Sequence, residues 1–192
     1  MKTIKHITLV ILIAGASINF TSCKGKEKAE AQKGEIEIVV HCSGKEYFST
    51  KKEFKASAVG ESLDQATAKK KAMSNAKADL AGTIQTTIKA TIDNYVNSRE
   101  FNNKEQVEEK FEGLSREVIN QKLSGVVTVC EKTFRTTGTN KYKTYICLEL
   151  RADDLVDAIN DRLTKDESLR IDYDYEKFKE TFNAEMEKLE GK

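Results

Sequence analysis

Residues 60–96 read GESLDQATAKKKAMSNAKADLAGTIQTTIKATIDNYV, and this stretch decides the fold. Apolar residues recur in it at every fourth position, and a step of four advances about 40° past a full turn of an α-helix. They therefore form one stripe that turns slowly around the helix. Its side chains are small in the first half and larger in the second: Ala72, Ala76, Leu80, Ile84, Ile88, Ile92 and Val96. The pattern predicts a single long helix on which the remaining elements pack.

The start and the polar face of this helix also leave signals in the sequence. Gly60 is expected to end a preceding strand, and Ser62 to cap the helix, with Gln65 three residues later as its capping-box partner. Lysines fill positions 69–71 on the other face. They predict a solvated face rather than a basic ligand site, because acidic residues surround them in the chain.

Composition limits the classes of function. The chain has 192 residues, which suggests one domain with an appendage. Its formal net charge of +1 argues against a nucleic-acid partner, because such proteins usually present a basic field. Hydrophobic residues make up 39% of the chain, enough for one core, and the absence of proline fits long uninterrupted helices.

The first residues predict export. Lys2 and Lys5 precede an apolar run at 7–18, which is too short to cross a bilayer, since a spanning helix needs about 20 residues. Cys23 follows, and then a polar segment. This order resembles a bacterial lipoprotein signal, in which the cysteine carries the lipid and the chain is cut before it. The alternative is ordinary signal cleavage after residues 14–16.

The predicted organisation has four parts. Residues 1–22 form the lipoprotein signal peptide, 23–34 a flexible polar tether, 35–165 an α+β domain and 166–192 a C-terminal amphipathic helix. The resemblance to lipoproteins implies that the chain is anchored in the outer membrane through the lipid on Cys23, because no aspartate follows that cysteine. The lysine-rich tether favours the periplasmic side of that membrane.

Two strands are expected before the long helix. Residues 35–42 alternate, with Ile36, Ile38, Val40 and Cys42 on one face, so Cys42 is predicted to be an unpaired core residue. His41 then points to the opposite face. Residues 47–59 predict a second strand, after a turn at 43–45.

Helices and a hairpin are expected after the long helix. Asn102 or Asn103 starts a second helix that ends near 123–125, and the two helices form an antiparallel pair. Shorter helices follow at 152–165 and 172–189. The apolar positions that indicate these three helices are Val107, Phe111, Leu114, Val118, Leu155, Ile159, Leu163, Tyr175, Phe178, Phe182, Met186 and Leu189.

Residues 126–135 and 142–150 predict a β-hairpin between these helices. If Gly138 and Thr139 form a two-residue loop, Cys130 lies opposite Cys147 in a non-hydrogen-bonded pair, where side chains approach most closely. The same register places Val127 and Val129 on a mostly apolar face. A Cys130–Cys147 disulfide fits an exported protein. Two reduced cysteines on one strand face are the alternative.

No catalytic arrangement emerges from the sequence. The chain has no G-x-S-x-G, P-loop, G-x-G-x-x-G or H-E-x-x-H motif. His41 is the one histidine left after the signal, and as a strand neighbour of Cys42 it points away from it. We therefore expect no catalytic residues, no metal site and no cofactor, and we predict that the protein is not an enzyme.

Several short patterns resemble one known family. They are A-S-A-V-G at 56–60, A-x-x-x-A-x-x-x-L-A-x-x-I at 72–84, V-x-V at 127–129 and Y-I-C-L at 145–148. Together they resemble the Lpp-twenty type outer-membrane lipoproteins and the N-terminal domain of a flagellar assembly protein. The resemblance implies a helix on a sheet and an antigenic, adhesive or envelope-assembly role, and it supplies no catalytic residues.

The sequence therefore predicts an α+β fold, with an antiparallel sheet of three to four strands packed against a long helical hairpin, plus C-terminal helices. The function expected from it is that of a lipid-anchored, non-catalytic cell-envelope protein with a structural or interaction role and with envelope-protein partners. The alternative is a small-ligand-binding module of the periplasm. A deep apolar pocket favours that alternative, and a solidly packed core favours the structural role.

Overall fold

The structure is a computed structural model that describes residues 38–101, 103–169 and 173–190. The signal peptide, Cys23 and the tether at 23–34 lie outside the described residues, as do Asn102 and residues 35–37 of the first expected strand. Within the described ranges, no helix is long and apolar enough to cross a membrane.

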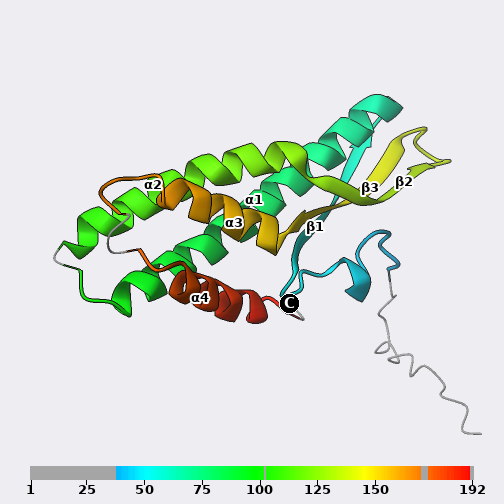
Figure 1. Ribbon diagram of the computed structural model, residues 1–192. Helices are drawn as coiled ribbons and strands as arrows, with labels where there is room; N and C mark the ends of the chain where they lie inside the picture. Colours follow the sequence, from blue (N-terminus) through cyan, green and yellow to red (C-terminus); the bar gives the residue numbers. More distant parts are fainter. Residues whose placement is uncertain (1–37, 102, 170–172, 191–192) are drawn as a thin grey trace, which may run out of the picture. The chain divides into compact units, whose positions relative to one another are not determined.

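The predicted α+β class is confirmed (Figure 1). Within the described residues, three antiparallel strands form one sheet in the order β1-β3-β2, and of the four α-helices α1 packs against the sheet. The strands are β1 (Glu53–Ser62), β2 (Val127–Arg135) and β3 (Tyr142–Arg151). The helices are α1 (Gln65–Asn97), α2 (Lys104–Lys122), α3 (Ala152–Leu163) and α4 (Tyr175–Glu187), and two short 3₁₀ turns are η1 (Lys45–Tyr47) and η2 (Leu123–Gly125).

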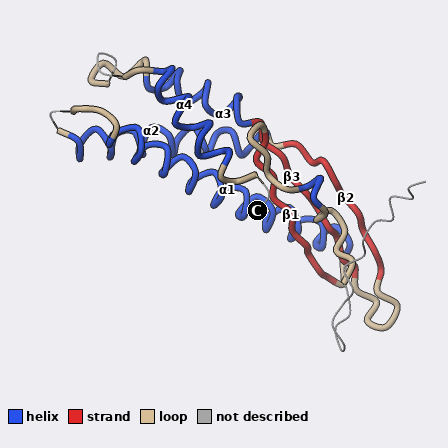
Figure 2. Tube along the Cα trace, turned by 90° about the horizontal axis from the view of Figure 1, so that it is seen from below, coloured by secondary structure: helices blue, strands red, loops and turns tan. Residues whose placement is uncertain are grey.

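Helix α1 joins the two halves of the core. Every member of its predicted stripe is buried. The first half packs on the inner face of the sheet, which presents Phe54 from β1 together with Ile146 and Leu148 from β3. The second half packs against α2 and α4, while α3 packs on α2 (Figure 2). Thr87 and Thr91 widen the buried stripe, because each hydroxyl donates to the carbonyl oxygen four residues earlier.

An aromatic cluster fastens α2 and α4 to the second half of α1. The Tyr95 ring lies 5.7 Å from Phe111 of α2 and 5.4 Å from Phe178 of α4, centroid to centroid. Its hydroxyl accepts a 2.8 Å hydrogen bond from the backbone N–H of Asp174, which itself caps α4. The C-terminal helix predicted within 166–192 is thereby part of the same core, through Phe178, Phe182 and Met186.

The junction of β1 and α1 differs from the prediction. The strand continues through Gly60 to Ser62, so Ser62 does not cap the helix. Asp64 does, because its carboxylate accepts a 2.8 Å hydrogen bond from the backbone N–H of Thr67. Gly60 lies where the helix backbone comes closest to the strand. A Cβ there would sit 2.3 Å from the Ala68 carbonyl oxygen and 2.4 Å from the Ala72 nitrogen.

The strand predicted at 35–42 is wrong in its described part. Residues 38–40 belong to no strand, and His41 and Cys42 lie in a turn in which Cys42 has a φ of 56°. The second expected strand, 47–59, begins instead at Glu53, after the η1 turn. Alternating apolar residues indicate a strand only when a neighbouring strand pairs with them. Here His41 and Cys42 instead contact side chains on the outer face of β2 and β3.

The hairpin register is confirmed over most of its length. Cys130 lies opposite Cys147 and Glu131 opposite Ile146. An irregularity between Thr128 and Cys130 shifts the register by one residue, which is the signature of a β-bulge. The apolar face predicted for 127–129 is therefore wrong, since Val127 and Val129 are 59% and 39% exposed.

The close approach at Gly60 gives a prediction for stability. Replacing Gly60 by Ala should lower the free energy of unfolding by at least about 1–3 kcal/mol, because the new methyl group overlaps helix backbone that cannot rotate away. Urea denaturation checks this. Gly82→Ala is the matched control: a Cβ at this position of α1 meets nothing within 4 Å, so the change should stabilise by about 0.5–1 kcal/mol. Equal effects at the two sites contradict the prediction.

Candidate functional site: the disulfide on the outer face of the sheet

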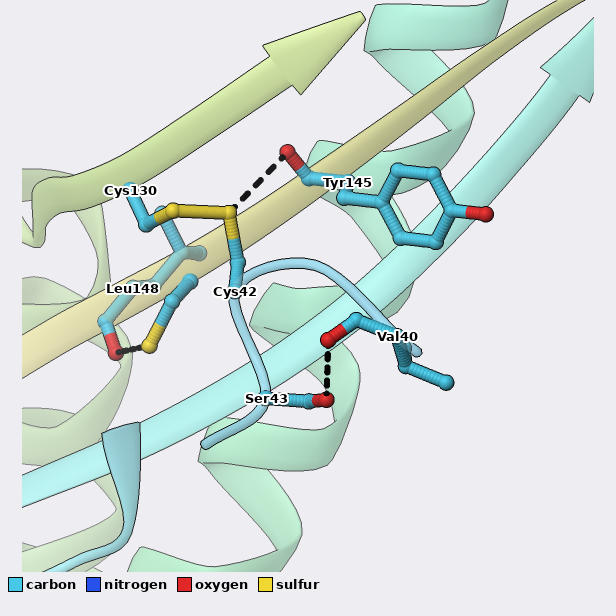
Figure 3. Close-up of a disulfide and its surroundings, with 7 residues drawn as sticks. Val40, Cys42, Ser43, Cys130, Tyr145 and Leu148 are labelled. Carbon is cyan, nitrogen blue, oxygen red and sulfur yellow. Dashed lines mark hydrogen bonds between the residues drawn. A yellow bond between two sulfur atoms is a disulfide. The ribbon is translucent and has the colours of Figure 1, made fainter. Parts of the chain in front are cut away.

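The outer face of the sheet, opposite α1, carries a covalent cross-link. Successive residues of a strand point to opposite faces, so Tyr145 and Cys147 face outward while Ile146 and Leu148 face the helix. Cys42, which precedes β1 in the chain, forms a disulfide with Cys130 of β2 across this face (Figure 3). The two Cα atoms are 5.6 Å apart, and 88 positions separate the residues in sequence.

The predicted Cys130–Cys147 disulfide is wrong, although the two residues do lie opposite each other. Cys147 is a free thiol with 0% exposure, and it donates to the Leu148 carbonyl oxygen at 3.7 Å. The hairpin loop explains the error. The Thr136 N–H donates to the Lys141 carbonyl oxygen at 2.8 Å, so four residues, not two, form the loop.

This longer loop changes the kind of pair in which the cysteines lie. Hydrogen-bonded and non-hydrogen-bonded pairs alternate along an antiparallel ladder, so a bonded pair at Thr136 and Lys141 makes Cys130 and Cys147 a bonded pair too. Cα atoms of bonded pairs are about 5.5 Å apart, against about 4.5 Å in the other kind. The Cys130 side chain instead meets Cys42, which reaches it from above the sheet.

Aromatic rings surround the cross-link. The His41 ring stacks on Phe134 of β2 with centroids 4.4 Å apart, and it meets Tyr145 of β3 edge-on at 5.4 Å. The Cys42 sulfur lies 3.8 Å from the Tyr145 carbonyl oxygen, a contact rather than a hydrogen bond, because a disulfide sulfur has no hydrogen to donate. His41 and Cys42 thus both face the sheet, because the turn removes the strand alternation that was expected to separate them.

The disulfide in this cluster serves as a structural cross-link, and the remaining thiol is poorly reactive. Burial raises the pKa of the Cys147 thiol above its usual value, so little of the reactive thiolate exists at neutral pH. Sequence reasoning missed Cys42 as the partner of Cys130. The turn expected at 43–45 was the one signal in the sequence that bears on this pairing. It shows that the chain reverses direction after Cys42, but it does not show which strand Cys42 would contact.

A cluster of carboxylates lies elsewhere, between α1 and α2. Carboxylate oxygens of Asp93, Glu108 and Glu112 all lie within 4.8 Å of one another, a spacing that suits a metal ion. The Lys89 ammonium already serves as the counter-ion, through a hydrogen bond to Glu112 and an ion pair with Asp93 at 3.8 Å. Burial and the neighbouring Asp93 raise the pKa of Glu108, so this group resists ionisation in the folded protein.

The surface also has shallow hollows. One of ≈ 650 Å³ lies beside α2, η2 and α3 and is lined largely by polar and charged side chains, among them Lys122, Asp161 and Arg162. Another, of ≈ 210 Å³, lies between α1 and α2 over Ile88 and Ile119. Both open to solvent, so neither is the deep apolar pocket that a carrier of small apolar ligands needs.

No family model, no curated protein and no solved structure matches this chain. The disulfide joins the turn at His41 and Cys42 to β2, and it is the candidate functional site.

The cysteine pairing gives a prediction. Peptide mapping of the non-reduced protein should find Cys42 linked to Cys130, and Cys147 should react with a thiol reagent only after unfolding. Replacing both Cys42 and Cys130 by Ala should lower the free energy of unfolding by about 2–5 kcal/mol, because the bond closes a long loop. Cys147→Ala is the control that keeps the disulfide. A Cys130–Cys147 peptide would overturn this assignment.

The carboxylate cluster gives a prediction for pH dependence. Because the pKa of Glu108 is higher in the folded state than in the unfolded chain, the folded state loses stability as pH rises from the ordinary glutamate pKa through the raised folded-state pKa. Glu108→Gln should therefore raise the melting temperature at pH 7, and the gain should vanish near about pH 3, where both states are protonated. Glu109→Gln, at an exposed site of α2, is the control. If the melting temperature of Glu108→Gln is still raised at about pH 3, ionisation of Glu108 is not the cause of the gain.

Proposed function

We propose that the protein is a lipid-anchored, non-catalytic component of the bacterial cell envelope with a structural or interaction role. The lipid is carried by Cys23, and the folded body faces the periplasm from the outer membrane. The signal-like residues 1–22, the cysteine that follows them and the polar tether support this proposal. So does the resemblance of the chain to the Lpp-twenty type lipoproteins.

The observation that carries the proposal is the Cys42–Cys130 disulfide. Disulfides persist in oxidising compartments such as the periplasm and are rare in the cytosol, which supports export. The position of the bond in the chain also supports the proposal. It ties the residues next to the tether directly to β2, so a force from the membrane anchor reaches the sheet through a covalent bond. Without it, the same force would act on residues 43–52, the segment that contains η1 and leads into β1.

The packing favours this role over small-ligand binding. Large apolar side chains from α1 and the sheet fill the centre of the domain, and Leu80, Ile84, Ile146 and Leu148 are fully buried there. The hollows lie at the surface and open to water. A rigid body on a lipid tether suits a scaffold or a docking component, with other envelope proteins as its partners.

Cell fractionation tests the proposal. Cys23→Ala should move the protein from the membrane fraction to the soluble periplasmic fraction, because the acylated thiol is the attachment. Mass spectrometry of the wild-type N-terminus should show a chain that begins at an acylated Cys23. Cys147→Ala should stay in the membrane fraction, which controls for the loss of a cysteine. An unmodified N-terminus at Ser17, with unchanged fractionation of the Cys23 variant, would refute lipid anchoring.

A further inference from the structure

The two edge strands of the sheet differ in whether their outward backbone groups are hydrogen-bonded. The backbone at the outer edge of β1 is occupied by side chains. Asn75 and Lys71 of α1 donate to the carbonyl oxygens of Val59 and Glu61, each at 3.2 Å. Ser49 accepts a 2.9 Å hydrogen bond from the Lys55 N–H. This edge is therefore closed to another strand.

The outer edge of β2 is open. Because Thr136 is hydrogen-bonded to Lys141 across the hairpin, the alternation along β2 turns the backbone groups of Glu131, Thr133 and Arg135 outward. Across the part of the chain that the structure describes, no hydrogen bond reaches these outward N–H and C=O groups. An edge in this state is a template for a further strand.

The surroundings of β2 leave room for that strand. Helix α1 packs mainly on β1 and β3, and β2 lies at the margin of the sheet (Figures 1 and 2). Lys69 of α1 forms a 2.9 Å ion pair with the Glu131 side chain on the helix-facing side and leaves the backbone edge of β2 unoccupied. Every β2 residue except Cys130 is exposed, and Phe134 keeps 43% of its surface in water even under His41. The disulfide holds β2 from one face only, through Cys42, and leaves its edge clear.

The sequence of β2 is complementary to itself in one antiparallel register. Residues 131–135 read Glu-Lys-Thr-Phe-Arg. When Thr133 lies opposite Thr133 of a second copy, Glu131 faces Arg135 and Lys132 faces Phe134. Opposite charges facing across strands are favourable, and like charges are not. Other antiparallel registers that pair the same outward groups are less favourable. A register centred on Glu131, Lys132 or Arg135 places that residue opposite the like-charged residue of the second copy. A register centred on Phe134 forms neither of the two Glu131–Arg135 ion pairs.

We propose that two copies of this chain pair through the open edges of β2, antiparallel about Thr133, to form one continuous sheet. The interface is isologous, since the same surface serves both copies. Growth stops at two, because the edges that remain are those of β1, which α1 already occupies. The β-bulge beside Val129 ends the pairing at the other end of the strand. The proposal does not depend on the lipid at Cys23.

Charge reversal tests the register directly. We expect sedimentation velocity on the full mature chain to show a reversible dimer. Glu131→Arg and Arg135→Glu should each weaken it by about tenfold or more, a loss of about 1.4 kcal/mol. The double variant carrying both reversals should recover dimerisation, because opposite charges then face each other again with their signs exchanged. Circular dichroism confirms that each variant is folded, and Lys69→Ala, which removes the partner of Glu131 within its own chain and leaves β2 unchanged, is the control and should leave the dimer intact.

Cross-linking locates the contact. Thr133→Cys should be captured as a covalent dimer by a short thiol-specific cross-linker, since Thr133 faces its own copy across the two-fold axis; the probe is a cross-linker because Thr133 would lie in a hydrogen-bonded pair, whose Cα atoms are about 5.5 Å apart. Val59→Cys, exposed on β1, should not. Any of three results overturns the proposal: a monomer at every concentration, a dimer unaffected by the single reversals, or a dimer that the double reversal fails to restore. Fibres or larger oligomers would refute closure at two copies.

Discussion

The structure depends on the burial of one helical stripe. Helix α1 is longer than the sheet it covers, so its first half packs on strands and its second half on helices. Fully burying an aliphatic side chain stabilises a fold by about 1.5–3 kcal/mol. Leu80, Ile84, Ile88 and Ile92 together thus match the net stability of a whole domain, about 5–15 kcal/mol. The small residues come first because the sheet backbone lies closest there, at Gly60.

The two faces of the sheet are stabilised by different physics. The inner face is covered by apolar burial against α1. The outer face has too few apolar residues for that, and it is covered by a short segment without strand pairing. A disulfide and the stacked ring of His41 hold this segment in place. Covalent attachment suits it because it lies next to the tether, where local contacts alone would fray.

The polar groups at the sheet edges complete this arrangement. Long polar side chains of α1 reach around β1 and satisfy its outward carbonyl groups, which a two-layer fold would otherwise leave to water. Helix α1 reaches β2 through an ion pair between Lys69 and the Glu131 side chain, but within the described residues no hydrogen bond satisfies the outward backbone groups of Glu131, Thr133 and Arg135. A sheet with one open edge and one closed edge is suited to limited association with a second copy.

The sequence by itself determined the long helix, the helical pair, the hairpin and most of its register, because these follow from local periodicity and turn residues. It also predicts an export signal at residues 1–22, which lie outside the described residues. Only the tertiary structure decided the partner of Cys130, because that depends on whether the loop has two residues or four and on where residues 38–42 lie. The tertiary structure likewise decided the role of Gly60, since a close approach between a strand and a helix leaves no periodic signal in either.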